Sequence, residues 1–476
     1  MFERYRTIVP HWEAFCNILE EPLPPCIWVH PTRVRDITTL TGWLEAHGIQ
    51  LYPLPWLPGA YRWEGPLPPG KHTGFALGLY HIQEAVSQLP VHFLEPHPGE
   101  RILDLCAAPG NKTAGIALAM HLQGTVVAND RDPYRLRVLR RTLDRLGITN
   151  VTTLAHDGAN LPGRIAYFDR ILVDAPCSCE GTSRKHALHT RQQGPHFSSK
   201  VTGLQRALLR KAVHLCKPGG RIVYATCTYA PEENEEIVDA ILREYGEQIL
   251  RVLPVTPPEG LRVAPGLTTW QHRRLHPSLQ DTLRIWPHLN DTGGFFIAVL
   301  EKQALPPHAP PPRPPEVIPD ASSEAWPFLE QAVERFELPP SYLETFDWLP
   351  PSGKTLFGVH RQHSWKHPEL GGITGLGLMR IKLRYPKLTT AAAMLWGPHA
   401  RRHVVPLTEE QVIAFLRREP VTLTSDQLAT CDTMGYVLCR YEEWGVGIGF
   451  WDGRSNQIES LFPRGWLGQA HLASGM

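Results

Sequence analysis

The sequence predicts an α/β fold in which a mostly parallel sheet carries helices on both faces. From Arg101 onward, apolar runs alternate with amphipathic segments, which is typical of parallel strands joined by helices. Several of the apolar runs end in an acid or a cysteine, and the carboxyl ends of parallel strands form the ligand-binding edge of such a sheet. Glycine or proline follows these ends, as turns from strand to helix require.

Length and composition indicate a soluble protein of two or three domains. The chain has 476 residues, of which 42% are apolar and 20% charged. Its nine cysteines are scattered and odd in number, which favours a reducing compartment over a disulfide framework. No apolar run approaches the ~20 residues of a membrane span, and MFERYRTIVPHWE is unlike a signal peptide. We therefore expect a cytoplasmic monomer without a membrane partner.

Positive charge is concentrated in two stretches, although the net charge of +1 gives no support for a nucleic-acid partner. Residues 181–231 contain nine Lys or Arg and four His without a single acid. Residues 358–403 contain eight Lys or Arg and one acid, Glu369. We interpret both stretches as local contact surfaces for an anion; a pair of solvated faces is the alternative.

The first unit, residues 1–95, is expected to be a small α/β domain. The segment 37–48 (ITTLTGWLEAHG) has helical apolar spacing and a glycine stop, and the extended segments CIWVH and IQLYPLPW flank it. A second helix is expected over 78–94, with Ile82, Val86 and Leu89 on one face and a kink or break at Pro90.

The second unit, residues 96–302, contains the alternating pattern. Strands are expected at RILDL, GTVVAND, VTTLA, FDRILVDAP, GRIVYATC and GGFFIAVLEK. Helices are expected at NKTAGIALAMHL, at 204–216, at 233–245 and over the arginine-rich segment 133–146. In a parallel sheet these elements bring five side chains to one edge: Asp104, Asp130, Asp157, Asp174 and Cys227.

The last part of the chain begins with a proline-rich run. Residues 303–323 predict a semi-rigid extended linker, or else a ligand for a proline-binding domain. Residues 324–476 predict a β-rich domain with helices near 326–335 and 409–418. Its segments RQHSWKHPEL and MRIKLRYPK mix aromatic and basic residues, which suits RNA shape and stacked bases; an ordinary domain surface is the alternative.

The loop CAAPGNK, which follows a buried strand and opens a helix, predicts a cofactor site. Its small residues let the backbone approach a ligand, and the helix start favours a carboxylate or phosphate. The patterns GxGxxG and GxxxxGK[ST] are absent, which weakens nicotinamide, flavin and nucleoside triphosphate interpretations. Asp130 is placed to bond ribose hydroxyls and Asp157 to reach an adenine amine. Although a single strand-end acid is commonly a cap, this series suits S-adenosylmethionine.

Two cysteine stretches, DAPCSCEG with Cys177 and YATCTYAPEEN with Cys227, predict the chemistry. Each follows an apolar run, so the two thiols can face one cleft. A thiolate that attacks carbon 6 of cytosine raises the electron density at carbon 5, which then accepts a methyl group. Afterwards a base must remove the carbon-5 proton so that the cysteine is eliminated. An acid such as Asp174, if protonated, can hold N3 of the ring.

Other interpretations of the cysteines remain open. Inert buried thiols are expected at four positions: Cys16, Cys216, Cys431 and Cys439. A four-thiolate metal site is the alternative for four others: Cys106, Cys177, Cys179 and Cys227. However, Cys-x-Cys is not the usual Cys-x-x-Cys ligand pair. A non-catalytic RNA-binding or ribosome-assembly protein is the rival from another class, although it would need no paired thiols.

Several stretches together resemble the RNA cytosine-5 methyltransferases of the Sun/Nop type: LDLCAAPGNKT, VVAND, HDG, DAPCSCEGTSRK, KPGGRIVYATCTYAPEENE and DTGGFFIAVLEK. The resemblance extends to GLYHIQEAVSQLP, to PLPPCIWVH and to the C-terminal domain. It implies a Rossmann-like methyltransferase fold between an N-terminal RNA-binding unit and a C-terminal PUA-like domain. The layout is most similar to bacterial ribosomal RNA enzymes, so 16S ribosomal RNA or the small subunit is the first expected substrate and transfer RNA the second.

The resemblance also implies residue roles. Cys227 would be the nucleophile and Cys177 would assist product release, with Asp174 and Lys112 beside them. The residues alone leave this order open, because DNA cytosine-5 methyltransferases attack with a Pro-Cys cysteine. S-adenosylmethionine would contact Cys106, Ala107, Ala108, Pro109, Gly110, Asn111, Lys112, Asp130, Asp157 and Asp174. RNA phosphates would contact Arg184 and Lys185.

The sequence departs from the family pattern at three places. Asn111 stands where the family usually has Gly or Ser, and Cys179 where it usually has Gly. Trp28 and His30 stand in the places of the usual Arg-Val-Asn, so the RNA contacts of the first unit are not carried over.

Overall fold

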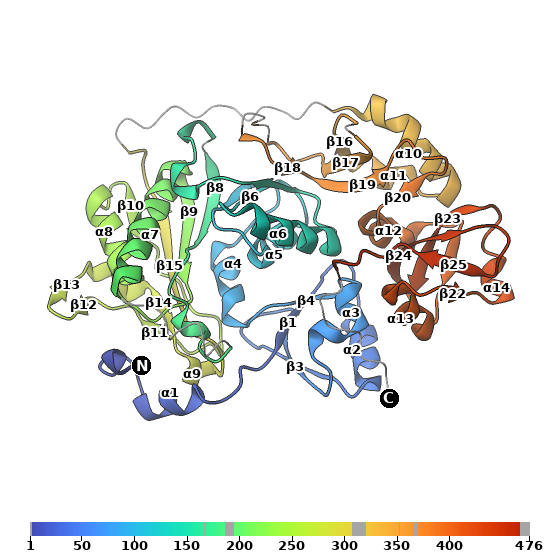
Figure 1. Ribbon diagram of the computed structural model, residues 1–476. Helices are drawn as coiled ribbons and strands as arrows, with labels where there is room; N and C mark the ends of the chain where they lie inside the picture. The colour runs from blue at the N-terminus through green and yellow to red at the C-terminus, as the bar shows by residue number, and fades with distance from the viewer. Residues whose placement is uncertain are drawn as a thin grey trace.

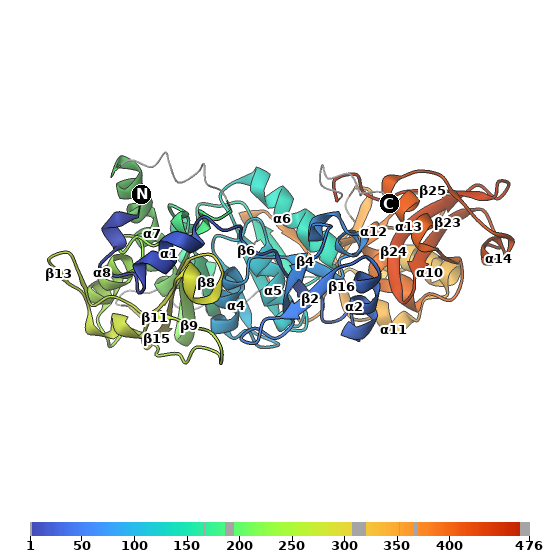
Figure 2. The ribbon, with the colours of Figure 1, turned by 90° about the horizontal axis from the view of Figure 1, so that it is seen from below.

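The protein is an elongated α/β molecule in this computed structural model (Figures 1 and 2). The structure describes residues 2–165, 167–185, 195–306, 320–351, 353–365, 367 and 370–466. Figure 1 shows the central elements on one side, the C-terminal β-rich elements on the other, and most of the N-terminal unit between them at the bottom of the view.

The N-terminal unit contains an antiparallel sheet with the strand order β2-β3-β1-β4. Its strands are β1 (Cys26–Val29), β2 (Gln50–Pro53), β3 (Ala60–Glu64) and β4 (Tyr80–Ile82). Its helices are α1 (Trp12–Ile18), α2 (Ile37–Ala46) and α3 (Thr73–Ala76). The expected helix over 37–48 is confirmed as α2, whose start is capped by Asp36 accepting from the Thr38 amide.

The helix predicted over 78–94 is wrong in its first half. Strand β4 replaces it there and pairs with β1, a 3-10 turn follows at Val86–Gln88, and only α4 (Leu89–Leu94) is helical. Pairing with a distant strand therefore outweighed the local apolar spacing. Pro90 neither kinks nor breaks α4, because it lies in the first turn, where its missing N–H costs no helical hydrogen bond.

The described residues of the central unit build most of a ten-stranded sheet with the order β11-β14-β15-β9-β8-β5-β6-β7-β18, and β10 pairs with β15. The parallel strands are β5 (Arg101–Asp104), β6 (Thr125–Asn129), β7 (Val151–Leu154), β8 (Phe168–Asp174) and β9 (Cys216–Thr226). The antiparallel strands are β10 (Leu250–Val252), β11 (Ala264–Pro265), β14 (Leu283–Ile285), β15 (Phe295–Lys302) and β18 (Ile373–Thr374). The hairpin β12 (Thr269–Trp270) and β13 (Arg273–Arg274) lies apart.

Helices cover both faces of this sheet, as predicted. One hydrophobic core joins the sheet to α7 (Pro195–Leu215) and α8 (Glu235–Tyr245). The other joins it to α4, α5 (Asn111–Ala119) and α6 (Pro133–Leu146). The arrangement is a Rossmann-like fold, so the expected fold class is confirmed for this part of the chain.

The C-terminal region is separate and β-rich. Its sheets have the orders β16-β17-β19-β20 and β21-β23-β24-β25-β22. The strands are β16 (Phe346–Trp348), β17 (Thr355–His360), β19 (Leu376–Arg380), β20 (Lys387–Leu388), β21 (Val404–Pro406), β22 (Val421–Thr422), β23 (Gly435–Tyr441), β24 (Trp444–Trp451) and β25 (Gln457–Ser460). The helices are α10 (Ser322–Phe336), α11 (Pro340–Leu343), α12 (Thr390–Trp396), α13 (Glu409–Arg417) and α14 (Ser425–Leu428). Helices α10 and α13 match the two expected ones.

The C-terminal region is anchored on the central sheet. Strand β18 comes from it and pairs antiparallel with β7. The Thr152 hydroxyl bonds His363 Nε2 and the Thr374 hydroxyl, both at 2.8 Å, and Trp365 is buried in the central core. The described part of RQHSWKHPEL therefore makes domain-docking contacts through His363 and Trp365, while Arg361 and Gln362 are exposed and their RNA contact stays a prediction.

Two predicted features lie wholly or partly outside the residues that the structure describes. Residues 307–319, the greater part of the expected linker over 303–323, lie outside the described ranges, as do 186–194 within the basic stretch 181–231. In the ranges that are described, no helix is long and apolar enough to cross a membrane.

Candidate active site

The ends of the parallel strands bring the five predicted side chains to one edge of the sheet. Asp104 and Asp174 are the last residues of β5 and β8. Asp130 and Cys227 directly follow β6 and β9, and Asp157 lies three residues beyond β7. These strands are parallel neighbours, so their carboxyl ends lie side by side.

Three cysteine thiols meet at this edge. The Sγ atoms of Cys177 and Cys227 are 3.4 Å apart, and those of Cys177 and Cys179 are 3.9 Å apart. All three lie within 4.8 Å of one another, and Cys106 is not part of this group. The alternative of a four-thiolate metal site therefore lacks one of its four ligands, Cys106. Cys179 has φ = 58°, a left-handed conformation that favours glycine.

Hydrogen bonds hold the two cysteine loops against each other. The Ser178 amide donates to Glu233 Oε2 at 2.9 Å, and the Ser178 and Thr228 hydroxyls are 2.6 Å apart. The Gly181 amide donates to the Cys227 carbonyl at 2.9 Å. A Cβ at Gly181 would lie 2.2 Å from the Gly294 carbonyl oxygen, so only glycine fits this approach. These contacts fix the separation of the Cys177 and Cys227 sulfurs.

A partly buried ion pair joins the start of α5 to the end of β8. Lys112 Nζ is 2.6 Å from Asp174 Oδ2 and 5.5 Å from the centre of the Phe295 ring. Burial acts to lower the pKa of Lys112, but the charge and hydrogen bond of Asp174 outweigh it, so the pKa is raised. Lys112 is therefore a cation at neutral pH, and Asp174 is held as its partner.

The loop between β5 and α5 has the features of a ligand cradle. Gly110 has φ = 104°, and a Cβ there would lie 2.9 Å from Leu139 Cγ. The Ala108 amide donates to Asp130 Oδ2 at 3.2 Å. Asp104 Oδ1 is buried and has no partner among the described residues, while burial raises the pKa of this carboxyl to about 7. Small residues, strand-end acids and an unpartnered carboxylate oxygen fit a ligand that carries hydroxyl and amine donors.

Comparison with known proteins places the chain in a family. Residues 91–301 match the family model described as 16S rRNA methyltransferase RsmB/F. A tRNA (cytosine(49)-C(5))-methyltransferase of Pyrococcus abyssi is 35% identical over 305 residues, which cover 63% of this chain and 95% of that protein. The chain belongs to the RsmB/F methyltransferase family. A solved structure of a methyltransferase homologue from Pyrococcus horikoshii is 32% identical, with a TM-score of 0.56 over 63% of this chain and 94% of that one.

Two further relatives of this RsmB/F chain differ in how much of their own length aligns with it. Ribosomal RNA small subunit methyltransferase F of Aeromonas hydrophila is 29% identical over 479 residues, covering 95% of this chain and 93% of that protein. The 28S rRNA (cytosine-C(5))-methyltransferase of Mus musculus is 38% identical over 288 residues, covering 58% of this chain. The match covers only 35% of the mouse protein, so the chain spans about a third of that relative's length.

The two facing thiols of this RsmB/F protein are hard to ionise. Hydrogen bonds with Cys179 and Cys227, together with burial, raise the pKa of Cys177 well above its usual value. For Cys227 the contact with Cys177 lowers the pKa, but the contact with Cys179 and burial outweigh it and the pKa is raised. Both sulfurs are therefore protonated at neutral pH.

Alkylation of Cys227 should therefore accelerate steeply with pH. Below its raised pKa, the thiolate fraction increases tenfold per pH unit, so we expect the rate with iodoacetamide to rise about 100-fold between pH 7 and 9. Peptide-resolved mass spectrometry measures this rate, and the exposed Cys16 monitors the reagent in the same digest. A rate that levels off below pH 8 would contradict a raised pKa.

A histidine that sequence reasoning missed supports the loop between β5 and α5 of this RsmB/F chain. His81 Nδ1 accepts from the Arg145 guanidinium at 2.7 Å, so its Nε2 donates to Asn111 Oδ1 at 3.0 Å. Burial lowers the pKa of His81 to about 3, which keeps the ring neutral. The unusual Asn111 is thus held by the N-terminal unit. A histidine within the apolar segment GLYHI was the available signal.

Trp28 and His30, the other residues that depart from the family pattern, lie where the N-terminal and central units pack together. Trp28 Nε1 donates to Gln83 Oε1 at 2.9 Å, and its ring lies 5.3 Å from that of His81. His30 is buried and its Nε2 is 3.0 Å from the Leu146 carbonyl oxygen. The His30 contact therefore joins the N-terminal unit to α6, whereas Trp28 packs against the core that the two units share.

The expectation that Arg184 contacts RNA is not supported by its surroundings. Its side chain is 1% exposed and is 2.8 Å from Asp291. It also donates to the carbonyls of Glu21, Pro22 and Thr292. The hydrogen-bond donors of Arg184 are therefore used within the protein. Lys185 is exposed, and its phosphate contact stays a prediction.

Proposed function

We propose that the chain methylates carbon 5 of cytosine in RNA with S-adenosylmethionine, through a covalent cysteine–cytosine adduct. The observation that carries this proposal is the pair of thiols at the ends of β8 and β9, 3.4 Å apart. The ion pair between Lys112 and Asp174 beside them supports it, as do relatives that are named RNA cytosine-C5 methyltransferases. A non-catalytic RNA-binding protein would have no use for this pair.

S-adenosylmethionine would lie along the loop from Cys106 to Lys112, between the acids at the strand ends. Asp130 would accept from its ribose hydroxyls, and Asp157 would accept from its adenine amine. Asp174 and Lys112 would lie between the cofactor and the target base. When bound, the cofactor supplies an electrophilic methyl group.

Cys227 begins the reaction in this proposal. As its Sγ bonds carbon 6, its proton passes to N3 of the ring and the electrons of the carbon 5–carbon 6 double bond raise the electron density at carbon 5. Asp174 accepts a hydrogen bond from the protonated N3, and Lys112 holds Asp174 in place. After methylation, solvent accepts the carbon-5 proton, and the electrons of that bond restore the carbon 5–carbon 6 double bond and expel the Cys227 sulfur, which takes back the proton from N3. Cys177, within reach of the Cys227 sulfur, assists this release.

The substrate is proposed to be 16S ribosomal RNA or the small subunit, with transfer RNA second. The tRNA enzyme of Pyrococcus abyssi aligns with only 63% of this chain, whereas the small-subunit ribosomal RNA enzyme of Aeromonas hydrophila aligns with 95%. In this proposal residues 1–95 are an RNA-binding unit, 96–302 the methyltransferase domain, 303–323 a linker and 324–476 a PUA-like RNA-binding domain.

Transcribed 16S ribosomal RNA and transfer RNA, incubated with methyl-labelled S-adenosylmethionine, test the proposal. We expect 5-methylcytosine in the ribosomal RNA. RNA that contains 5-fluorocytosine should trap a denaturation-resistant adduct, because fluorine cannot leave carbon 5 as a proton does. Methyl transfer to another atom, or the absence of any adduct, would refute the mechanism.

The variant Asp174→Asn should slow single-turnover methylation by about 100-fold without changing RNA affinity. It removes the carboxylate that holds the base and leaves Lys112 unpaired, and acid–base groups typically contribute ~10²–10⁴-fold. Rapid-quench measurements at saturating RNA report the rate. The exposed Asp426→Asn is the matched control, and equal rates in the two variants would exclude Asp174 from the chemistry.

A further inference from the structure

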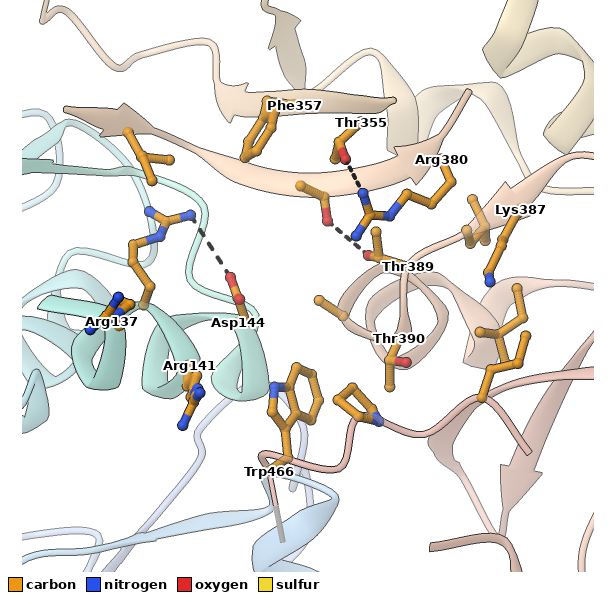
Figure 3. Close-up of a pocket in the computed structure, with 18 residues that line it drawn as sticks. Arg137, Arg141, Asp144, Thr355, Phe357, Arg380, Lys387, Thr389, Thr390 and Trp466 are labelled. Atoms are coloured by element: carbon orange, nitrogen blue, oxygen red, sulfur yellow. Dashed lines mark hydrogen bonds and ion pairs between the residues drawn. The ribbon is translucent and has the colours of Figure 1, made fainter. Parts of the chain in front are cut away.

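A cavity of about 600 Å³ lies between α6 and the C-terminal region. Figure 3 shows Arg137 and Arg141 of α6 on one side of its opening and Arg380 and Lys387 on the other, with Trp466 between them. Its volume lies within the ~300–1,000 Å³ of typical ligand pockets. It is distinct from the thiol cluster, and the proposed chemistry makes no use of it.

The lining of this cavity is strongly cationic. Among its described lining residues are Arg137, Arg140, Arg141, Arg380 and Lys387, against one acid, Asp144. Burial, and then the neighbouring charge of Arg380, lower the pKa of Lys387, as expected where positive charges crowd together. Such a cavity attracts an anion.

Several of these donors are only partly used by the protein. Arg140 donates to the Gly375 carbonyl at 2.7 Å and lies 3.8 Å from Asp144. Its buried Nη1 atom has no partner among the residues that the structure describes. Arg380 uses one nitrogen for the Thr355 hydroxyl at 2.6 Å. An acceptor group bound in the cavity would satisfy the remaining donors.

The cavity also has aromatic and apolar walls. Phe357 and Trp466 line it, and so does Ile373, which is 47% exposed. Arginine next to aromatic faces is typical of surfaces that hold unpaired bases and their phosphates. An acidic polypeptide would use the charges but not the aromatic walls, so RNA fits this lining better.

The cavity is preformed, because contacts next to it fix the two regions together. Strand β18 pairs with β7, and the next residue, Gly375, accepts from Arg140 on α6. In its first half, α6 reaches the loop between β5 and α5, because Arg135 donates to the Ala108 carbonyl and pairs at 3.2 Å with Asp130, which follows β6. Arg140 lies five positions after Arg135, about 7.5 Å along the helix. One helix therefore connects the cavity to the cofactor loop.

We propose that this interdomain cavity binds a nucleotide of the substrate RNA away from the target cytosine, with its phosphate on the arginines and its base or ribose against Trp466 and Phe357. The inference rests on the proposed RNA substrate. It assigns part of the segment MRIKLRYPK, through Arg380 and Lys387, to a defined nucleotide site, and it gives the arginine-rich helix α6 a role in placing the RNA.

The double variant R141Q/R380Q tests this assignment in the full-length protein. We expect it to bind transcribed 16S ribosomal RNA about tenfold or more weakly and to raise the KM for RNA, with kcat at saturating RNA unchanged. The slope of log affinity against log salt should fall by about 1.5, since each phosphate contact contributes ~0.7–0.9. The pair R141K/R380K should recover part of the affinity because it keeps the charge.

The control is R274Q/R454Q, which removes two exposed arginines outside the cavity. The inference is overturned if R141Q/R380Q keeps the RNA affinity and salt slope of the wild type, or loses no more than this control. It is also overturned if polyglutamate or inorganic phosphate competes as well as RNA for the site. Anisotropy titration measures binding without methyl transfer, so a wild type that binds RNA but does not methylate it would refute the proposed function alone.

Discussion

The variant Cys227→Ala should lose both methyl transfer and adduct formation. Cys227 lies at the end of β9, and the Gly181 amide holds its carbonyl at 2.9 Å. Removing a nucleophile eliminates the covalent pathway altogether, and comparable losses in other enzymes reach ~10⁶-fold. We expect at least about a 10⁴-fold fall in single-turnover rate, measured with methyl-labelled S-adenosylmethionine and 16S ribosomal RNA.

The control for this variant is Cys16→Ala, which removes an exposed cysteine from α1 and should retain full activity. Thermal unfolding should show that Cys227→Ala remains folded. Methyl transfer that survives in Cys227→Ala would disprove the assignment and move the attack to the sulfur 3.4 Å away.

The variant Cys177→Ala should attack cytosine but fail to release it. The nucleophile is intact, whereas the neighbouring sulfur that assists elimination is gone. We expect multiple turnover to fall by about 10³-fold, while a denaturation-resistant protein–RNA adduct accumulates toward one RNA per protein. Denaturing electrophoresis with labelled RNA measures the adduct.

The matched control for Cys177→Ala is Cys179→Gly, which removes the third thiol and suits the positive φ of that position. It should turn over without a trapped adduct. If Cys177→Ala forms no adduct while Cys227→Ala does, the two roles are reversed, which is the order that the residues alone had left open.

The central sheet could be predicted because its elements carry strong local signals. Helix α6 matches its expected range, since Asp132 caps its start and Gly147 ends it in a left-handed conformation. The short strand β4 was missed because three residues give no usable periodicity and its pairing with β1 is distant in sequence. The edge strand β18, which is two residues long, was missed for the same reason.

The candidate site, too, could be predicted from the sequence only in part. The strand ends already predicted which acids and cysteines lie together, because parallel neighbours end at one edge. The 3.4 Å approach of two sulfurs and the hydrogen bond from His81 to Asn111 depend on side-chain packing between distant segments. The burial of Arg184 under Asp291 and three carbonyls could not be inferred from a basic sequence either.

The pairing of β18 with β7 has a consequence for synthesis of the chain. Residues 151–154 form β7, but their outer partner consists of residues 373–374. A ribosome that adds ~5–20 residues per second needs at least about ten seconds to make the intervening segment. During that interval the nascent sheet has an open edge with unpaired amide and carbonyl groups, which can recruit other chains. A chaperone that shields this edge until the C-terminal region emerges would improve the yield of folded protein.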